Sequence, residues 1–503
     1  MMTGAWTWPF FGAAGALVLS GAAALHLSGS TVRAATETVN SDGYLMIDGA
    51  PRLIIGSYEL PADDDALRCL ADNGFNLVRA DDRAGLDRLR RLGLYGWLCV
   101  DPRFDEKDEA ARQKLSQTVE RAKDHPALLV WELPDEILWN IWYSRVDRAL
   151  WGEKKALQEE IEKVRTTAPA ERIVAWERTL EKAQDLMFRE LHEQGESLHD
   201  TLWRELGQKN PYPDARLSRC FALADAETEA VARGCRLIRQ LDPGRAIWQN
   251  HAPRNVLNRL RPYNACVDAA GCDIYPAPFT VGVHSDLKDV TLSAVGAYTD
   301  RMRAAAPGKA VWMVLQGFGW RDIDQGIRNA PDPARGRRPA LNETRFMAYD
   351  ALVHDANAIL YWGTAFIEKD GELLADLMKV SREIRALEPA IVGERSKRPP
   401  VVTADESSGS IDPGDGPRVI LRRTGGEWVL VAVNEREQGV SFAVARLPKA
   451  LEGRALHRLY SEETLTVQGR GFRDGILGYG VNVYATSRRF EASAAGQPAS
   501  PSS

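Results

Sequence analysis

Between about residues 43 and 387 the chain repeats one pattern, in which a short apolar run ends on a polar residue, Pro or Gly and an amphipathic helical segment follows. Near-continuous apolar strands that alternate with helices predict a parallel sheet covered by helices. Eight units favour a closed (β/α)8 barrel, an α/β fold, and no glycine-rich nucleotide-binding motif follows the first run. The eight predicted strands are 53–60, 75–81, 95–102, 127–136, 246–253, 267–278, 310–319 and 358–366.

The connection after the fourth run, about residues 138–218, is far longer than a barrel loop. It contains two sets of apolar residues at helical spacing, separated by residues 166–169. We therefore predict a helical hairpin inserted after strand four. Its charged surface either faces solvent or forms a lid or a homo-oligomer contact. The two sets are Leu157, Ile161 and Val164, and Trp176, Leu180, Ala183, Met187 and Leu191.

The pattern changes after the barrel, which we place at residues 43–390. Short alternating strands with turn signals over residues 397–490 predict a C-terminal, all-β sandwich. Residues 491–503 are polar and rich in Ala, Ser and Pro, so we expect a disordered tail.

Residues 1–35 differ from the rest, because no Asp, Glu, Lys or Arg occurs from Ala5 to Leu27. This segment is typical of a signal peptide or of an uncleaved N-terminal membrane anchor. In both cases we expect the rest of the chain outside the cytoplasmic membrane, as a secreted, periplasmic or anchored protein.

Charge and cysteine content exclude several classes of function. The 64 Lys and Arg residues against 70 Asp and Glu residues give a net charge of -6, which makes nucleic acid an unfavourable partner. The six cysteines form no CxxC pair and the eight histidines are scattered. We expect no metal site and no cofactor.

Chemistry in such a barrel lies where the strands end at their carboxyl side. Carboxylates, amides and aromatic residues dominate these positions, a mixture that suits a carbohydrate with its hydroxyl groups and apolar ring faces. The candidate site residues are Glu59, Arg79, Asp101, Asp135, Glu136, Asn250, His251, Asp273, Tyr275, Gln316, Trp320 and Trp362, and Glu132 also lies at a strand end.

Residues 124–136, with the sequence DHPALLVWELPDE, resemble the strand-four motif of the clan A glycoside hydrolases. The resemblance implies that Glu136 is the general acid/base. It also implies that the preceding residue contacts the sugar 2-hydroxyl, and here that residue is Asp135 instead of Asn. Residues 273–276 are similar to the strand-six segment, whose Tyr orients the second carboxylate, here Tyr275. The trailing β-sandwich is similar to the C-terminal domain that many of these enzymes carry.

Strand seven departs from that pattern, because it ends on Gln316 where the clan has its nucleophilic Glu. Glycoside hydrolysis normally needs two carboxyl groups. The candidates for the second one are Asp273, Glu59, Asp135 and Asp101, and Asp273 is preferred. We expect it to leave room for a water molecule, as inversion requires, or to serve a substrate whose own acetamido group attacks.

The sequence therefore predicts a glycosidase that acts on an extracytoplasmic oligo- or polysaccharide. The alternative is a catalytically inactive barrel that binds a glycan. Three side-chain roles also stay open at this point. Glu136 could form an ion pair with Arg79, and Gln316 is either a ligand contact or a hydrogen-bonded buried amide. Trp131, Trp312 and Trp362 either line the site or fill the barrel core.

Overall fold

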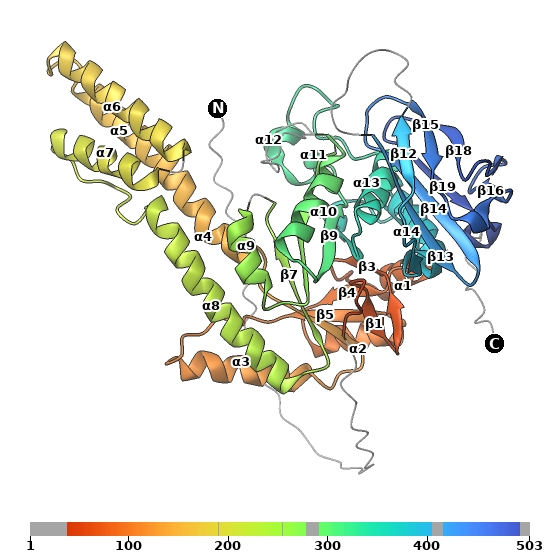
Figure 1. Cartoon of the computed structure of the whole chain (residues 1–503). Helices are drawn as coiled ribbons and strands as arrows, with labels where there is room; N and C mark the ends of the chain where they lie inside the picture. The colour runs from red at the N-terminus through yellow and green to blue at the C-terminus, as the bar shows by residue number, and fades with distance from the viewer. Residues whose placement is uncertain (1–37, 190, 254, 278–290, 405–415, 493–503) are drawn as a thin grey trace, which may run out of the picture. The chain divides into compact units, whose positions relative to one another are not determined.

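A computed structural model describes residues 38–189, 191–253, 255–277, 291–404 and 416–492. Eight parallel strands close into a barrel with the order β10-β3-β4-β5-β6-β7-β8-β9, which confirms the predicted (β/α)8 architecture (Figure 1). A short antiparallel pair, β1 (Leu45–Ile47) and β2 (Ala50–Arg52), precedes it. The barrel strands are β3 (Ile54–Ser57), β4 (Leu77–Ala80), β5 (Tyr95–Cys99), β6 (Leu128–Glu132), β7 (Ala246–His251), β8 (Ala269–Ile274), β9 (Ala310–Gln316) and β10 (Ala358–Trp362).

Four aromatic side chains from alternate strands fill the barrel interior. The Tyr58 ring, which follows β3, lies 5.3 Å from the Trp97 ring and 6.5 Å from the Trp248 ring. Trp248 in turn lies 5.3 Å from Trp312. Rings on β5, β7 and β9 can meet only inside the cylinder, as one layer of a barrel core. A side chain at Gly271 would contact both Trp248 and the Trp312 backbone, so only glycine fits between them.

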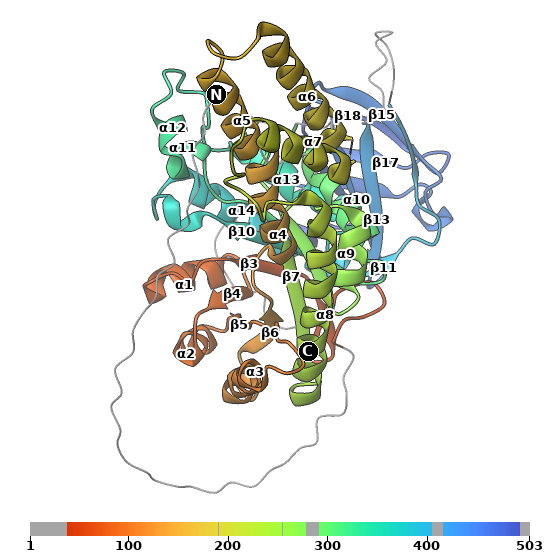
Figure 2. The same ribbon diagram turned by 90° about the vertical axis from the view of Figure 1, so that its left-hand side faces the viewer.

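Helices cover the outside of the barrel and begin at well-defined caps. Asp63, Asp82 and Asp108 each accept a hydrogen bond from a backbone N–H in the first turn of the helix that follows. Trp131 faces outward, because its Nε1 donates to Asp242 at the end of α8. The covering helices, several of which are visible in Figure 2, are α1 (Asp64–Asp72), α2 (Arg83–Arg91), α3 (Glu109–Ala122), α8 (Leu217–Leu241), α9 (Leu257–Asn264), α10 (Ala294–Ala305), α13 (Leu341–Val353) and α14 (Glu372–Ile391).

The insertion after β6 is larger than a hairpin. The two predicted helices are α5 (Glu153–Lys163) and α6 (Ala170–Phe188), and they pack through a core that includes Leu157, Ile161, Trp176 and Leu180. Leu191 does not belong to the α6 face, since it follows the helix and is exposed. The additional elements are α4 (Ile137–Val146), the π-helix η1 (Asp147–Gly152) and α7 (His192–Glu205), and α8 then begins at Leu217.

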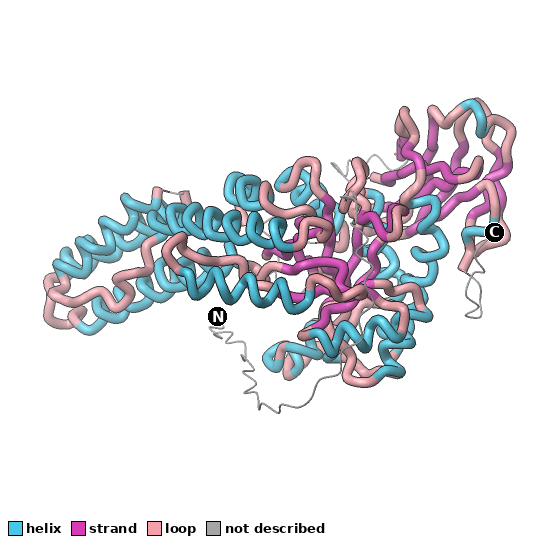
Figure 3. The backbone as a smooth tube through the Cα atoms, turned by 90° about the horizontal axis from the view of Figure 1, so that it is seen from below, coloured by secondary structure: helices cyan, strands magenta, loops and turns pink. Residues whose placement is uncertain are grey.

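The C-terminal region forms the predicted β-sandwich, whose strands are magenta in Figure 3. Its buried core includes Leu430, Phe442, Phe472 and Tyr484. The six-stranded sheet contains β11 (Glu394–Arg395), β13 (Pro417–Thr424), β14 (Glu427–Asn434), β19 (Val481–Ala485), β16 (Ala455–Arg458) and β17 (Thr464–Thr466). The three-stranded sheet contains β12 (Val401–Ala404), β15 (Val440–Ala445) and β18 (Phe472–Ile476).

Two sequence expectations fall on residues that the structure does not describe: the signal or anchor segment at 1–35 and nearly all of the tail, 493–503. Within the described ranges, every helix is too short or too polar to cross a membrane.

A buried ion cluster joins the barrel to the sandwich. His354, just after α13, contacts Glu435 Oε1 through Nε2 at 2.7 Å and Asp300 Oδ2 through Nδ1 at 3.0 Å. Asp350 Oδ1 lies 3.8 Å from the same Nε2, and Arg418 of β13 binds Glu435 at 2.9 Å. Burial opposes the imidazolium charge, but the hydrogen bonds to Asp300 and Glu435 prevail and raise the pKa of His354 to about 9.

This cluster predicts a stability that falls with rising pH. A raised pKa in the folded state stabilises the fold fully below the ordinary pKa of 6.5, and this contribution is lost as the pH rises through about 9. His354→Gln should lower the free energy of unfolding by about 3 kcal/mol at pH 6, because carboxylates stay buried without their cation. Chemical denaturation at pH 6, 7.5 and 9 measures both effects. Equal pH dependence in the parent and the variant would contradict this assignment.

Candidate active site

The carboxyl ends of β6, β7 and β8 bring three predicted residues together. Asn250 Nδ2 donates to Asp135 Oδ1 at 2.9 Å and to Asp273 Oδ1 at 3.4 Å. Asn250 and Asp273 are buried, whereas Asp135 is exposed to solvent at the mouth of the barrel. The amide thus ties together two carboxylates that would otherwise repel each other.

Glu136 completes this group through an uncommon backbone conformation. Its φ angle is +51°, in the left-handed region that costs a non-glycine residue about 1–3 kcal/mol. The Glu136 N–H donates to the carbonyl of Asn250 at 3.2 Å, and its own carbonyl accepts from Asn140 N at 3.0 Å as α4 begins. These bonds hold the chain in the sharp turn between β6 and α4.

The carboxyl groups of Glu136 and Asp273 hydrogen bond to each other and share a proton. Burial and then the charges of Asp273 and Asp135 raise the pKa of Glu136 to about 10. Burial and then the charge of Asp135 raise the pKa of Asp273 to about 7, while hydrogen bonds from Glu136 and Asn250 limit that rise. At neutral pH Glu136 therefore stays protonated, whereas Asp273 is ionised in part of the molecules.

This direct contact differs from the spacing that we expected. Inverting glycosidases hold their two carboxyl groups about 6.5–9.5 Å apart, and retaining enzymes about 5–5.5 Å apart. Groups that hydrogen bond to each other are closer than either. The expected room for a water molecule between Glu136 and Asp273 is therefore wrong for this structure, because Asn250 draws Asp273 toward the turn that carries Glu136.

Glu132 lies deeper in the same mouth, although it is not among the candidate site residues predicted from the sequence. Its side chain is 2% exposed and accepts a hydrogen bond from Trp97 Nε1 at 3.0 Å. Burial raises its pKa to about 7, with Arg79 opposing and Asp135 adding to the rise. The signal that could have identified it is the two-residue period of a strand, which places Glu132 inside and its neighbour Trp131 outside.

Aromatic residues form one side of the mouth. The Tyr275 ring stacks on Trp362 at 5.5 Å, and both contact Phe318 at 5.1 Å. Trp320, at the start of α11 (Trp320–Ile323), lies 6.4 Å from Tyr275. Trp320 and Trp362 are half-buried, so part of each ring faces outward. Such partly exposed rings beside polar groups are suited to the apolar face of a sugar.

Two further candidate residues, Glu59 and Asp101, bind other protein groups at the rim of the barrel. Both oxygens of Glu59 are bonded, one to Gly363 N at 2.6 Å and the other to Thr364 Oγ1 at 2.6 Å, which joins the ends of β3 and β10. Asp101 pairs with Arg103 at 2.7 Å and is 52% exposed. Neither carboxylate hydrogen bonds to Glu136, so Asp273 alone among the alternatives contacts it.

The Gln316 side chain is buried and links two loops through hydrogen bonds to their backbone, so it does not face a ligand. Its Nε2 donates to the carbonyls of Ala277 and Phe318 at 2.5 and 3.0 Å, and its Oε1 accepts from Ala277 N at 2.8 Å. The side chain is fully buried. Of the two alternatives, the structure shows the hydrogen-bonded buried amide, and the expected ligand contact is wrong because both N–H donors are engaged by backbone.

His251 is also outside the mouth. Its Nε2 lies 2.8 Å from Asn264 Oδ1, and its ring packs edge-on against Tyr263 on α9 at 5.2 Å. Burial lowers its pKa to about 4, so the imidazole is neutral. The expected substrate contact is wrong because consecutive residues of β7 point to opposite sides, and Asn250 is the one that points inward.

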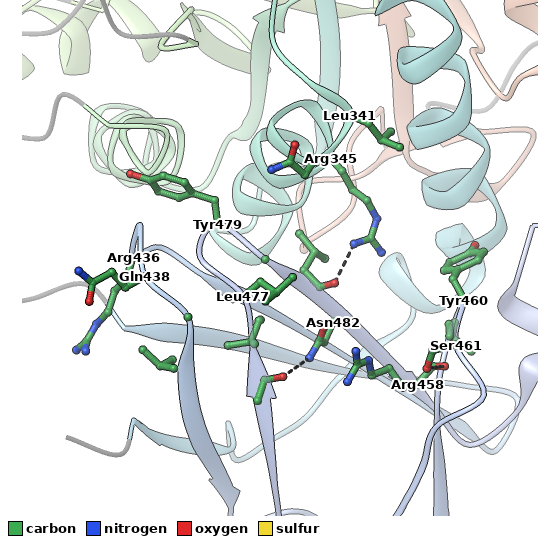
Figure 4. A pocket seen from close by; sticks show the side chains of 18 of the residues that line it. Leu341, Arg345, Arg436, Gln438, Arg458, Tyr460, Ser461, Leu477, Tyr479 and Asn482 are labelled. Carbon is green, nitrogen blue, oxygen red and sulfur yellow. Dashed lines mark hydrogen bonds between the residues drawn. The ribbon is translucent and has the colours of Figure 1, made fainter. Parts of the chain in front are cut away.

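Two other features could hold a ligand but lack this chemistry. Among the described residues, one group has metal-ligating geometry, namely Asp350, His354 and Glu435 at the barrel–sandwich junction. A cavity of about 1550 Å³ lies beside α13, α14 and the sandwich (Figure 4). In this cavity Arg345 pairs with Glu383 at 2.6 Å. Neither place lies at the carboxyl ends of the barrel strands.

Similarity to solved structures is extensive in fold and low in sequence. No family model and no curated protein matches the chain. The beta-galactosidase from Bacillus circulans sp. alkalophilus is 12% identical with a TM-score of 0.50, over 87% of this chain and 99% of that one. The beta-galactosidase from the psychrophilic Marinomonas ef1 is 15% identical with a TM-score of 0.40, over 67% of this chain and 60% of that one.

A third structure, a GH30 endoxylanase from Clostridium papyrosolvens C71, is 11% identical with a TM-score of 0.42, over 88% of this chain and 97% of that one. Identities this low bear on the fold alone. The likeness to the Bacillus circulans structure extends over 87% of this chain, which includes both the closed parallel barrel and the antiparallel β-sandwich. The chain thus has a (β/α)8-barrel fold that is similar to that of this beta-galactosidase.

Proposed function

We propose that this protein hydrolyses a glycosidic bond in an oligo- or polysaccharide. The observation that carries the proposal is the Glu136–Asp273 pair at the carboxyl end of the barrel, in which the pKa of Glu136 is raised to about 10 and that of Asp273 to about 7. Two titratable groups whose surroundings separate their pKa values are the usual arrangement for a general acid with a general base. The fold shared with a beta-galactosidase supports a carbohydrate substrate.

In this mechanism Glu136 donates its proton to the leaving glycosidic oxygen. The substrate replaces the hydrogen bond between Glu136 and Asp273 and separates the two groups, so that a water molecule reaches the anomeric carbon. Asp273 accepts the proton that this water releases as it attacks. After the products leave, the restored hydrogen bond returns the proton from Asp273 to Glu136 and resets the site.

The surrounding residues hold the sugar. Asp135 and Asn250 offer oxygen and nitrogen atoms to hydroxyl groups, and Trp362 with Tyr275 provides the ring face that stacks on the sugar. Arg79 partly offsets the charge of Glu132 beneath them. We further propose that the reaction takes place outside the cytoplasmic membrane, on the basis of the uncharged segment from Ala5 to Leu27.

A second candidate function is glycan binding without catalysis. It is favoured by Gln316, which occupies the strand-seven end and is fully engaged by backbone. In that case the two carboxyl groups would form hydrogen bonds to a bound sugar and would not cleave it. The two functions differ in turnover, which only the first predicts.

Removal of either carboxyl group should reduce turnover. Glu136→Gln and Asp273→Asn keep the hydrogen-bonding shape but remove the acid or the base, so kcat should fall by about 10²–10⁴-fold. Glu394→Gln is the matched control, because Glu394 is 76% exposed on β11 and pairs only loosely with Arg423, and it should keep parental kcat. Release of reducing ends from a glycan panel measures kcat. Undiminished turnover in Glu136→Gln would overturn the assignment.

Gln316→Glu should weaken the fold rather than supply a nucleophile. An ionised carboxylate would face the carbonyls of Ala277 and Phe318, so the free energy of unfolding should fall by about 2–4 kcal/mol at pH 8. The loss should shrink at pH 5, where a protonated Glu can still donate one hydrogen bond. Gln316→Met, similar in volume and uncharged, separates the loss of hydrogen bonds from charge repulsion. If Gln316→Glu were as stable as the parent at pH 8, the assigned hydrogen bonds between Gln316 and the loop backbone would be contradicted.

A further inference from the structure

The mouth of the barrel holds more acidic groups than any neutral sugar needs. The charge of Asp135 raises the pKa values of Glu132, Glu136 and Asp273, and Glu136 and Asp273 also influence each other. The cation that acts on these carboxyl groups is Arg79, which is half-buried beside Glu132. At neutral pH Glu136 stays protonated and Glu132 and Asp273 are only partly ionised, but together with Asp135 they still outweigh the one guanidinium, so the site repels anionic sugars and attracts cations.

A buried acceptor atom that lacks a donor also favours a cationic ligand. Asn250 Oδ1 is buried and has no hydrogen-bond partner among the described residues, whereas the buried Glu132 carboxylate has donors in Trp97 and Tyr58. A buried acceptor that stays unpaired costs about 1–3 kcal/mol, so a ligand that supplies donors relieves this cost. An ammonium group supplies three N–H donors and no acceptor.

The site is also open to such a ligand. Asp135 is exposed and Glu136 half-buried, so solvent reaches the upper two carboxyl groups. The half-buried ring of Trp362, stacked on Tyr275, presents π-electron density on which a cation is stabilised. The charge of the site, its unpaired acceptor and its aromatic rings thus all favour a ligand with an ammonium group.

We propose that the site selects a sugar that bears a protonated amine, such as a hexosamine unit of a glycan with free amino groups, with Asp135 as the main ion-pair partner. This inference rests on the proposed function and narrows its substrate class. A uronic acid would bring a fifth carboxylate into the mouth, and an N-acetylated sugar would lack the positive charge.

Proton release is an independent consequence of this recognition. In the empty site the pKa values of Glu132 and Asp273 are raised to about 7, so both carboxyl groups carry part of a proton at neutral pH. A bound ammonium group favours the ionised forms and expels that proton. Binding of an amino sugar should therefore release protons to the buffer near pH 7, and binding of a neutral sugar should not.

Titration calorimetry on the full chain tests the proposal with matched pairs of oligosaccharides. The probes are short glucosamine and galactosamine oligomers, each with free amines and in its N-acetylated form, titrated in two buffers of different ionisation enthalpy. We expect at least one free-amine form to bind about tenfold or more tightly than its acetylated partner and to release protons. Asp135→Asn should reduce this ratio severalfold, whereas Glu394→Gln should leave it unchanged.

A parallel assay for released reducing ends separates this proposal from the proposed function. Cleavage of glycans with no preference for the free amine overturns the amine proposal and leaves the hydrolase proposal standing. Preferential binding of amines without cleavage of any glycan supports the amine proposal and favours the binding function. No binding of any free-amine oligomer overturns the amine proposal, as does an unchanged ratio in Asp135→Asn.

Discussion

The site depends on one hydrogen bond between two carboxyl groups, Glu136 and Asp273, which share a single proton inside a closed barrel. Two ionised carboxylates in contact repel each other, and burial adds the cost of removing both from water. The molecule resolves this by keeping one group protonated. Acid and base chemistry near neutral pH follows from the same constraint, because it separates the pKa values of the two groups.

The surrounding structure holds the pair in place. Asn250 links Asp273 to Asp135 from a neighbouring strand, and the left-handed turn at Glu136 is fixed by a backbone hydrogen bond to that same residue. Below them, the Tyr58 ring packs edge-on against Trp97 and Trp248 and fills the barrel interior. The Gln316 side chain joins the loops after β8 and β9, which adjoin Tyr275 and Trp320.

Much of the fold could be predicted from the sequence, because each barrel strand is an apolar run that is buried on both sides and is followed by an amphipathic helix. Proximity of Asp135, Glu136 and Asp273 also followed, since parallel strands bring their carboxyl ends to one mouth. Side-chain direction was harder to predict. The errors at His251 and the omission of Glu132 both come from the two-residue period of a strand, which depends on a register that no single residue reveals.

The second limit of the sequence-based prediction was that the hydrogen-bond partners of a side chain could not be identified. Gln316 lies at a strand end with an interior-facing side chain, as a ligand contact would, yet its partners are backbone groups of a neighbouring loop. The spacing of Glu136 and Asp273 likewise depends on the amide of Asn250, which strand order alone does not indicate. The helical insertion exceeded a hairpin because the π-helix η1 continues α4 into α5 without a break signal in the sequence.

The most direct test of the shared proton is a carbon-13 NMR titration of the side-chain carboxyl groups in selectively labelled protein, with Glu136→Gln and Asp273→Asn used to assign the signals. The account predicts that the two groups titrate as a coupled pair with well-separated midpoints, one near pH 7 and one near pH 10. Midpoints for both groups near pH 4, as in isolated carboxylates, would contradict it.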